Sequence, residues 1–276
     1  MSTTSRDLPD YWPWMVAYHR VREPLYRRMI ADLSLAPDAR VLDAGCGDGF
    51  YSQLLATMLG PRCQIVAIDL SLALLNAAGD QTRSVQRCVG ALEDLGLAPA
   101  SFDVVWLCRS MHSAPDPLAR LGALVSLLRP GGRLIVVEND TAHSPILPFS
   151  AQFEHRLRAA RLRYERARSP NGALSQRYKS ATYLGQWLHQ LGLLDRSVRT
   201  YVSEDLAPFD DAVEAYWRQL LAWDANLLER FLSPTDAAIY CSTFDPHSPN
   251  DLLSRPGCYC LELTTLACAR RPEAAP

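Results

Sequence analysis

The clearest pattern along the chain is an alternation of short apolar runs with segments of helical spacing. Four apolar runs have the length of a strand: residues 40–43, 64–69, 102–107 and 133–138. Three segments between them place apolar side chains at helical intervals: residues 51–59, 71–78 and 117–128. This alternation is typical of βαβ units, which form a parallel sheet covered by helices on both faces. In such sheets a ligand binds beyond the carboxyl ends of the strands.

The rest of the chain has a different pattern. Helical spacing is found over residues 151–168 and 181–191, and an amphipathic, tryptophan-rich helix is expected over residues 210–232. Apolar and polar residues alternate as in strands over residues 195–202 and 258–269. Residues 11–33 also favour a helix, with Pro24 at its start or at a break. We expect these additional helices to cover the ligand cleft.

Composition narrows the class of protein. The 276 residues are 48% hydrophobic, which favours a full core over disorder, and the net charge of -2 gives no global attraction to nucleic acid. No apolar run approaches the roughly 18 residues that span a bilayer. The eight cysteines include no CxxC pair, so we expect no metal site and free thiols in a cytoplasmic protein.

The strongest chemical motif is the sequence VLDAGCGDG at residues 41–49, which joins a predicted strand to a helix. Its glycines allow a sharp turn and a close approach of backbone to ligand, and Asp43 adds a carboxylate that can hold a cation. A dinucleotide site is the weaker alternative, because the third glycine of a GxGxxG pattern falls on Phe50.

Together with three later segments, this loop resembles the class I S-adenosylmethionine-dependent methyltransferases, most closely their UbiE-like small-molecule branch. The matching segments follow in order: residues 65–69, residues 90–94, and residues 102–116 with the turn at 128–133. The resemblance implies an α/β fold with a doubly wound, mostly parallel seven-stranded sheet. Insertions would build a helical cap upon it.

The resemblance also implies a cofactor site for S-adenosyl-L-methionine. Asp69 would take the ribose hydroxyls, although capping the next helix beside Ser71 is an alternative role. Ala91 departs from the family's usual acid, which leaves the adenine contact to nearby groups. The full predicted set is Asp43, Gly45, Cys46, Gly47, Asp69, Leu70, Ala91, Leu92, Glu93 and Cys108.

Methyl transfer requires an acceptor atom held in line with the methyl–sulfur bond, with water excluded. His112, in the loop after the fourth predicted strand, is the first candidate for a general base, and a role in shaping that loop is its alternative. His143 and Tyr178 are weaker catalytic candidates. The candidates for acceptor binding are Tyr18, Arg109, His112, Asn139 and Trp217.

The predicted domain organisation follows from these assignments. Residues 1–34 form a helical segment over the cleft, residues 35–140 form the cofactor-binding core, residues 141–179 and 206–256 form the cap, and residues 180–205 and 257–270 complete the sheet. Six arginines occur in the helix at 151–168. They indicate an anionic acceptor, RNA, or a solvated face paired with Glu154 and Glu165.

The sequence therefore predicts an enzyme that methylates an oxygen, nitrogen or carbon atom of a small molecule, with specialised metabolism as one setting. Methylation of RNA or protein, or cofactor binding without methyl transfer, are the alternatives. No nucleic-acid or membrane partner is favoured, and the oligomeric state stays open, a homodimer included.

Overall fold

A computed structural model of the chain describes residues 7–77, 83–92, 94, 96–140, 143, 145–168 and 180–273, with the side chain of His112 outside this description. Its centre is a seven-stranded sheet in the order β3-β2-β1-β4-β5-β7-β6. The strands β1 (Arg40–Ala44), β2 (Gln64–Asp69), β3 (Val85–Val89), β4 (Phe102–Cys108) and β5 (Leu128–Asn139) are parallel. The strands β6 (Leu194–Leu206) and β7 (Tyr259–Arg270) form an antiparallel hairpin beside β5, so the expected fold class is confirmed.

The central strands are apolar on both faces because helices cover both. The helices α1 (Trp12–Asp32) and α2 (Phe50–Leu59) share one apolar cluster with β1 and β4. On the other face, α4 (Pro117–Leu127) and α7 (Ser180–Gln190) share a second cluster with the same strands. The short helix α3 (Leu72–Ala77) follows β2. The polypeptide therefore crosses the sheet repeatedly, as the sequence pattern predicts.

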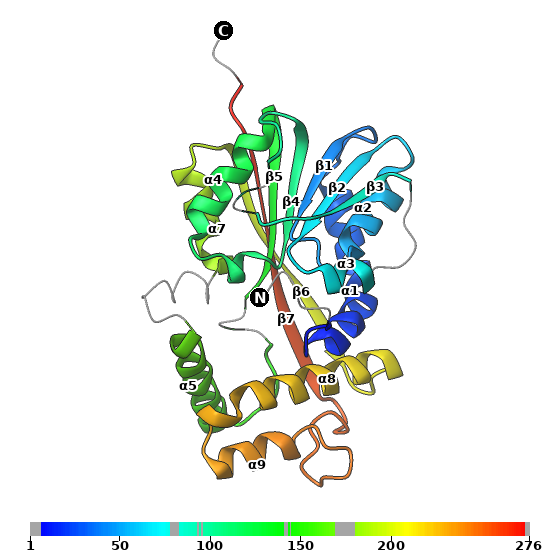
Figure 1. The fold of residues 1–276 in the computed structure, drawn as a ribbon. Coiled ribbons are helices and arrows are strands. Elements are labelled where there is room, and N and C mark those ends of the chain that lie inside the picture. The colour runs from blue at the N-terminus through cyan, green and yellow to red at the C-terminus, as the bar shows by residue number, and fades with distance from the viewer. Residues whose placement is uncertain are drawn as a thin grey trace.

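Three further helices lie beyond the sheet, at the end where the parallel strands terminate (Figure 1). They are α5 (Ala151–Arg168), α8 (Asp211–Leu228) and α9 (Pro234–Ser242). The short 3₁₀ helix η2 (Glu229–Phe231) joins α8 to α9, and a second one, η1 (Met111–Ser113), follows β4. The helix α1 packs along α8. These helices lie beyond the carboxyl ends of the parallel strands, where ligands bind in this architecture.

Some elements differ from the sequence-based expectation. Pro24 lies inside α1 without ending it, because tertiary packing of the buried face keeps the helix together. The strands β5 and β6 extend beyond the predicted ranges, and β3 and α9 were not predicted. None of the described helices has both the length and the apolar character needed to cross a membrane.

A buried ionic network fastens α1 to the rest of the fold. Arg22 donates from Nη1 and Nη2 to Asp205 at 3.0 and 2.5 Å, and from Nε to Glu262 at 2.9 Å. Tyr216 donates its hydroxyl to Glu262, and Trp217 donates its indole N–H to Asp205. One arginine of α1 therefore joins β6, β7 and α8.

Candidate active site

The glycine loop after β1 is held open by its own backbone. Gly45, Gly47 and Gly49 have φ angles of +77°, +57° and +75°, a region that side-chain-bearing residues adopt only with strain. The N–H groups of Gly45 and Cys46 both donate to the carbonyl of Ile68, at 2.8 and 3.0 Å. The loop is therefore tied to the end of β2.

Asp69 lies at the end of β2, where its carboxylate binds the backbone of both the glycine loop and the segment before α3. Its Oδ2 accepts from the Gly47 N–H and its Oδ1 accepts from the Ser71 N–H, each at 2.8 Å. Asp69 thus fixes the residue that precedes α3, whereas Ser71 caps that helix by accepting from the Leu74 N–H at 3.3 Å. Each carboxylate oxygen has further lone pairs, so these bonds leave the group able to accept from a vicinal diol.

Asp43 is the second acid of the site and is fully buried in β1. Ser52 donates its hydroxyl to Oδ2 at 2.5 Å, whereas Oδ1 is buried without a partner among the described residues. Burial, reinforced by the nearby Asp69 and Asp48, raises the pKa of Asp43 to about 7. A cationic group beside it would satisfy the free oxygen and favour the ionised form.

The space around the two glycines fits a nucleoside with a charged amino-acid portion. A Cβ on Gly47 would have no atom within 4 Å, so the loop is open there, whereas a Cβ on Gly45 would lie 2.9 Å from the Cβ of Ser110. Three features of this loop suit S-adenosylmethionine as a ligand. They are the open space at Gly47, the unpaired Oδ1 of Asp43 and the carboxylate of Asp69 at the end of β2. The ammonium of the ligand would face Asp43 and its ribose would face Asp69.

Helix α1 lies against this loop through contacts that the sequence did not reveal. His19 stacks on Phe50 with ring centroids 4.2 Å apart, and its Nδ1 lies 3.3 Å from the Asp48 carboxylate. Burial and the Asp69 carboxylate raise the pKa of Tyr11 to about 12, which indicates that the residue preceding α1 lies near Asp69. No local spacing signals these contacts, because their partners come from distant segments.

The loop after β4 is fixed by a buried glutamate. Glu138 accepts from the Met111 N–H at 2.7 Å and from the Ser180 hydroxyl at 3.3 Å. Burial raises the pKa of Glu138 to about 7, against the lowering effect of these bonds. Arg120 adds a bond to the Ser110 carbonyl at 2.9 Å. The backbone that presents residues 109–113 is therefore held from two sides.

Three of the predicted acceptor-binding residues meet at this loop. The guanidinium of Arg109 lies 4.1 Å from the ring centroid of Tyr18 and 5.1 Å from that of Trp14. The Tyr18 hydroxyl bonds to Tyr26 at 3.0 Å and donates weakly to Asn139 at 3.4 Å. The structure thus brings together Arg109, Tyr18 and Asn139.

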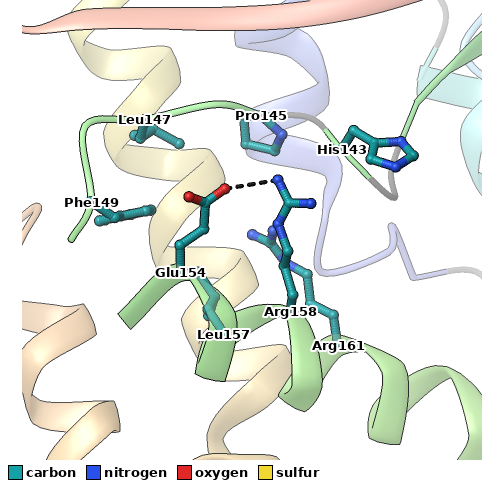
Figure 2. Close-up of a pocket in the computed structure, with 8 residues that line it drawn as sticks. All are labelled: His143, Pro145, Leu147, Phe149, Glu154, Leu157, Arg158 and Arg161. Carbon is teal, nitrogen blue, oxygen red and sulfur yellow. Dashed lines mark hydrogen bonds and ion pairs between the residues drawn. The ribbon is translucent and has the colours of Figure 1, made fainter. Parts of the chain in front are cut away.

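His143 follows the end of β5 and is paired with Asp140. Its Nδ1 lies 2.9 and 3.0 Å from the two carboxylate oxygens, and 46% of its side chain is exposed. It also borders a small pocket between residues 145–149 and α5, in which Glu154 and Arg158 are ion-paired (Figure 2). An acid that holds Nδ1 leaves Nε2 available to take a proton.

The remaining predicted residues divide into two groups. Leu70 and Ala91 are partly buried beside Asp69, Leu92 is buried next to Gly45, and the thiols of Cys46 and Cys108 bond to the Gly47 carbonyl and the Tyr26 hydroxyl. Trp217 is fully buried on Asp205, so this arrangement gives it a packing role and does not support acceptor contact. Glu93, Tyr178 and the His112 side chain lie outside the described residues.

Alanine substitutions at the two glycines are expected to separate stability from binding. Gly45→Ala forces a Cβ against Ser110 at positive φ and is expected to lower the free energy of unfolding by about 2 kcal/mol, whereas Gly47→Ala adds only backbone strain of about 1 kcal/mol. Gly47→Ala should nevertheless weaken cofactor binding at least ~10-fold, because its methyl enters the cradle. Urea unfolding and calorimetry with S-adenosylhomocysteine measure both; wild-type affinity in Gly47→Ala would contradict the placement.

The ionisation of Asp43 predicts a pH dependence of stability. The pKa of about 7 in the folded state exceeds the ordinary value of 3.8, so between these values the folded chain holds a proton that the unfolded chain has released. The free energy of unfolding should therefore fall as pH rises from 5 to 8. Asp43→Asn should remove about 2 kcal/mol of that fall in urea unfolding, the remainder belonging to Glu138 and other groups. Parallel pH profiles for the two proteins would refute the assignment.

Comparisons with known proteins agree with this geometry. A family described as "Methyltransferase domain" matches residues 42–136. A 2-phytyl-1,4-naphtoquinone methyltransferase of Synechococcus elongatus is 34% identical over 130 residues, which cover 45% of this chain and 56% of that protein. A ubiquinone biosynthesis O-methyltransferase of Xanthomonas campestris pv. campestris is 40% identical over 105 residues, covering 36% and 43%. The matches thus span about half the length of these relatives.

Solved structures share the whole fold at low sequence identity. The YcgJ protein of Bacillus subtilis aligns with a TM-score of 0.53 at 16% identity, over 90% of this chain and 97% of its own. A phosphoethanolamine N-methyltransferase 2 of Haemonchus contortus, solved with S-adenosylhomocysteine, aligns with a TM-score of 0.54 at 16% identity, over 94% of this chain and 57% of its own. Residues 42–136 therefore match a methyltransferase domain, and the solved structures share the chain's fold, as the resemblance to the class I S-adenosylmethionine-dependent methyltransferases predicts.

Proposed function

We propose that this protein transfers a methyl group from S-adenosylmethionine to an oxygen, nitrogen or carbon atom of a small-molecule acceptor. The observation that supports this most is the glycine loop, which is open at Gly47 and bonded there to Asp69. The relatives that this chain matches over about half of their length are named as quinone and ubiquinone methyltransferases. These names favour a flat organic acceptor.

The chain's own residues supply placement and exclusion of water. When bound, S-adenosylmethionine supplies an activated methyl group on a positively charged sulfur. Asp69 and the Gly47 backbone hold the nucleoside, Asp43 faces its cationic end, and the start of α1 covers the loop through Tyr11 and His19. Such placement provides most of the rate in a displacement whose leaving group is already activated.

His143 is proposed as the general base for an acceptor that loses a proton. Asp140 holds its Nδ1, and the half-exposed side chain leaves Nε2 to take the proton. His143→Asn should lower kcat about 100-fold while leaving the affinity for S-adenosylhomocysteine within about twofold of wild type. Asp140→Asn should have a smaller effect on kcat, since it disturbs only orientation. Unchanged kcat in His143→Asn would transfer the role to His112, which stays a prediction.

The arginine-rich helix does not favour an RNA substrate. Arg156 pairs with Asp236, Arg158 with Glu154 and Arg161 with Asp224, and Arg163 donates to the Phe231 carbonyl. These bonds join α5 to α8, α9 and η2 as well as to its own acid. We therefore propose a small-molecule acceptor rather than a nucleic acid, and a cytoplasmic setting in which all eight cysteines stay free thiols.

Two measurements test the proposal. Calorimetry with S-adenosylmethionine and S-adenosylhomocysteine should show binding to the purified chain, and binding of neither would overturn it. A pool of small molecules incubated with the chain and S-adenosylmethionine should then yield a product heavier by the mass of a methylene unit. Methylation of RNA in the same assay, with none of the small molecules, would favour the alternative.

A further inference from the structure

Three nitrogen atoms in the cap interface are buried donors without a hydrogen-bond acceptor in the part of the chain that the structure describes. They are Nη1 of Arg109, Nε1 of Trp14 and Nε1 of Trp223. A buried N–H that meets no acceptor costs about 1–3 kcal/mol, so native proteins contain few of them. Three on neighbouring side chains indicate a group that binds there.

The side chains of Arg109, Trp14 and Trp223 pack against one another in sequence. The guanidinium of Arg109 is 5.1 Å from the ring centroid of Trp14, and the rings of Trp14 and Trp223 have centroids 5.3 Å apart. The Tyr18 ring, 4.1 Å from the same guanidinium, covers it from another side. The three side chains that carry these donors are therefore neighbours, among aromatic rings from α1 and α8.

In the described part of the chain, the guanidinium of Arg109 also has no carboxylate in direct contact. Within the described residues no carboxylate lies within ion-pair distance of Arg109, whereas Arg22, eight residues after Trp14 on the same helix, meets two. Aromatic faces attract a guanidinium but do not neutralise it. The buried Glu138 interacts with Arg109 from beyond ion-pair distance, and this attraction lowers the pKa of Glu138. A buried guanidinium without a carboxylate in contact can still bind an anionic ligand directly.

The backbone of Arg109 supports a functional reason for its position. Its φ angle is +55°, a conformation that a residue with a side chain holds only under strain, and its N–H is fixed by the Val137 carbonyl at 2.8 Å. Strain of this kind persists where the surrounding structure requires one side-chain direction. Here that direction places the guanidinium among the rings of the cap.

The position favours the acceptor over the cofactor as the source of the anion. Trp14, Tyr18 and Trp223 come from α1 and α8, which lie outside the methyltransferase domain at residues 42–136. The cofactor's glycine loop and Asp69 are on other elements. The aromatic walls suit a flat ring, and the three donors suit an oxygen anion carried by that ring.

We propose that Arg109, Trp14 and Trp223 form a receptor for an oxyanion, a carboxylate or a phenolate, borne by a flat aromatic acceptor. This inference rests on the proposed function, whose acceptor it specifies. It assigns Arg109 to recognition of the acceptor's charge and the two indoles to hydrogen bonding of the same group.

The experiment compares three probes of one shape: 2-naphthoate, 2-naphthol at a pH where it ionises in part, and neutral 2-naphthamide. Calorimetry is carried out on the full chain saturated with S-adenosylhomocysteine. Naphthoate or naphtholate should bind at least ~10-fold more tightly than naphthamide, because a charge-assisted bond replaces a neutral one. The probe that binds more tightly distinguishes the carboxylate from the phenolate.

Variants then assign the effect to the three donors. Arg109→Gln should reduce anion binding to the naphthamide level, and Trp14→Phe and Trp223→Phe, which keep the ring and remove the N–H, should each weaken it about threefold. Arg129→Gln, an exposed arginine paired with Asp103 far from the cap, is the matched control. Affinity for S-adenosylhomocysteine should stay within about twofold in all four, as expected if the receptor does not contact the cofactor.

Each outcome decides a separate question. Equal binding of naphthoate, naphtholate and naphthamide to the wild type, or unchanged anion binding in Arg109→Gln and both phenylalanine variants, would overturn the receptor. Weaker S-adenosylhomocysteine binding in Arg109→Gln with unchanged naphthoate binding would assign the receptor to the cofactor's own carboxylate, which also overturns it. Absence of S-adenosylhomocysteine binding in the wild type would instead refute the proposed function.

Discussion

Replacing Asp69 by asparagine is expected to weaken binding of S-adenosylhomocysteine about 100-fold, the largest loss that a single polar substitution in the site should produce. The carboxylate has two tasks in this structure. It accepts from the Gly47 N–H through one oxygen and from the Ser71 N–H through the other, and it remains the acceptor available for the ribose hydroxyls.

Asparagine cannot perform both tasks. It has one carbonyl oxygen, so its amide N–H₂ must face either the Gly47 N–H or the Ser71 N–H, and donor would meet donor. It also removes the charge that strengthens both hydrogen bonds to a diol. We therefore expect the glycine loop to shift as well as the sugar contact to weaken, which is why the effect exceeds that of losing one neutral hydrogen bond.

The measurement is a calorimetric titration of Asp69→Asn beside wild type and Asp103→Asn. Asp103 is an acid on the opposite end of β4, where it pairs with the exposed Arg129, so its variant should bind within about twofold of wild type. Thermal unfolding of all three checks that each is folded. A loss below about fivefold in Asp69→Asn would place the ribose elsewhere, since a charge-assisted bond to a hydroxyl accounts for more than that.

The parallel core and its cofactor loop could be predicted because local chemistry dictates them. Each strand there is a short apolar run followed by its own helix, and the glycines of residues 45–49 and the acid at Asp69 sit where strand ends must place them. The same logic identified His143 and Asn139 at the end of β5. In these segments the hydrophobic pattern, the residue propensities and the packing favour the same structure, so a short stretch of sequence is enough to predict it.

The cap could not be predicted in the same way. Its contacts join residues far apart in the chain, such as His19 with Asp48, Arg161 with Asp224, and Arg109 with Trp14 and Tyr18. Helical spacing shows that an apolar face exists but not which partner covers it. For this reason the sequence could not show that Trp217 donates to buried Asp205, or that Arg156 of α5 pairs with Asp236 of α9.

Arg22 shows how strongly one such long-range contact determines the cap. Its guanidinium is 5% exposed and meets Asp205 and Glu262, which are themselves buried. Replacing Arg22 by methionine keeps much of the packing but leaves two carboxylates without a counter-ion. We expect the free energy of unfolding to fall by about 3–5 kcal/mol, the range measured when one partner of a buried ion pair is removed.

Two companion variants separate lost charge from lost packing. Combining Arg22→Met with Asp205→Asn and Glu262→Gln removes the uncompensated charges while keeping acceptors for Trp217 and Tyr216, and should restore more than half of the lost stability. Arg27→Met, on the same helix but exposed and paired only with Glu23, should cost less than about 1 kcal/mol. Urea unfolding at pH 7 measures all of them. If Arg22→Met costs no more than Arg27→Met, or if the triple variant is as unstable as the single one, the buried charges are not what holds α1 over the cofactor loop, and the apolar contacts between α1 and α8 must do so alone.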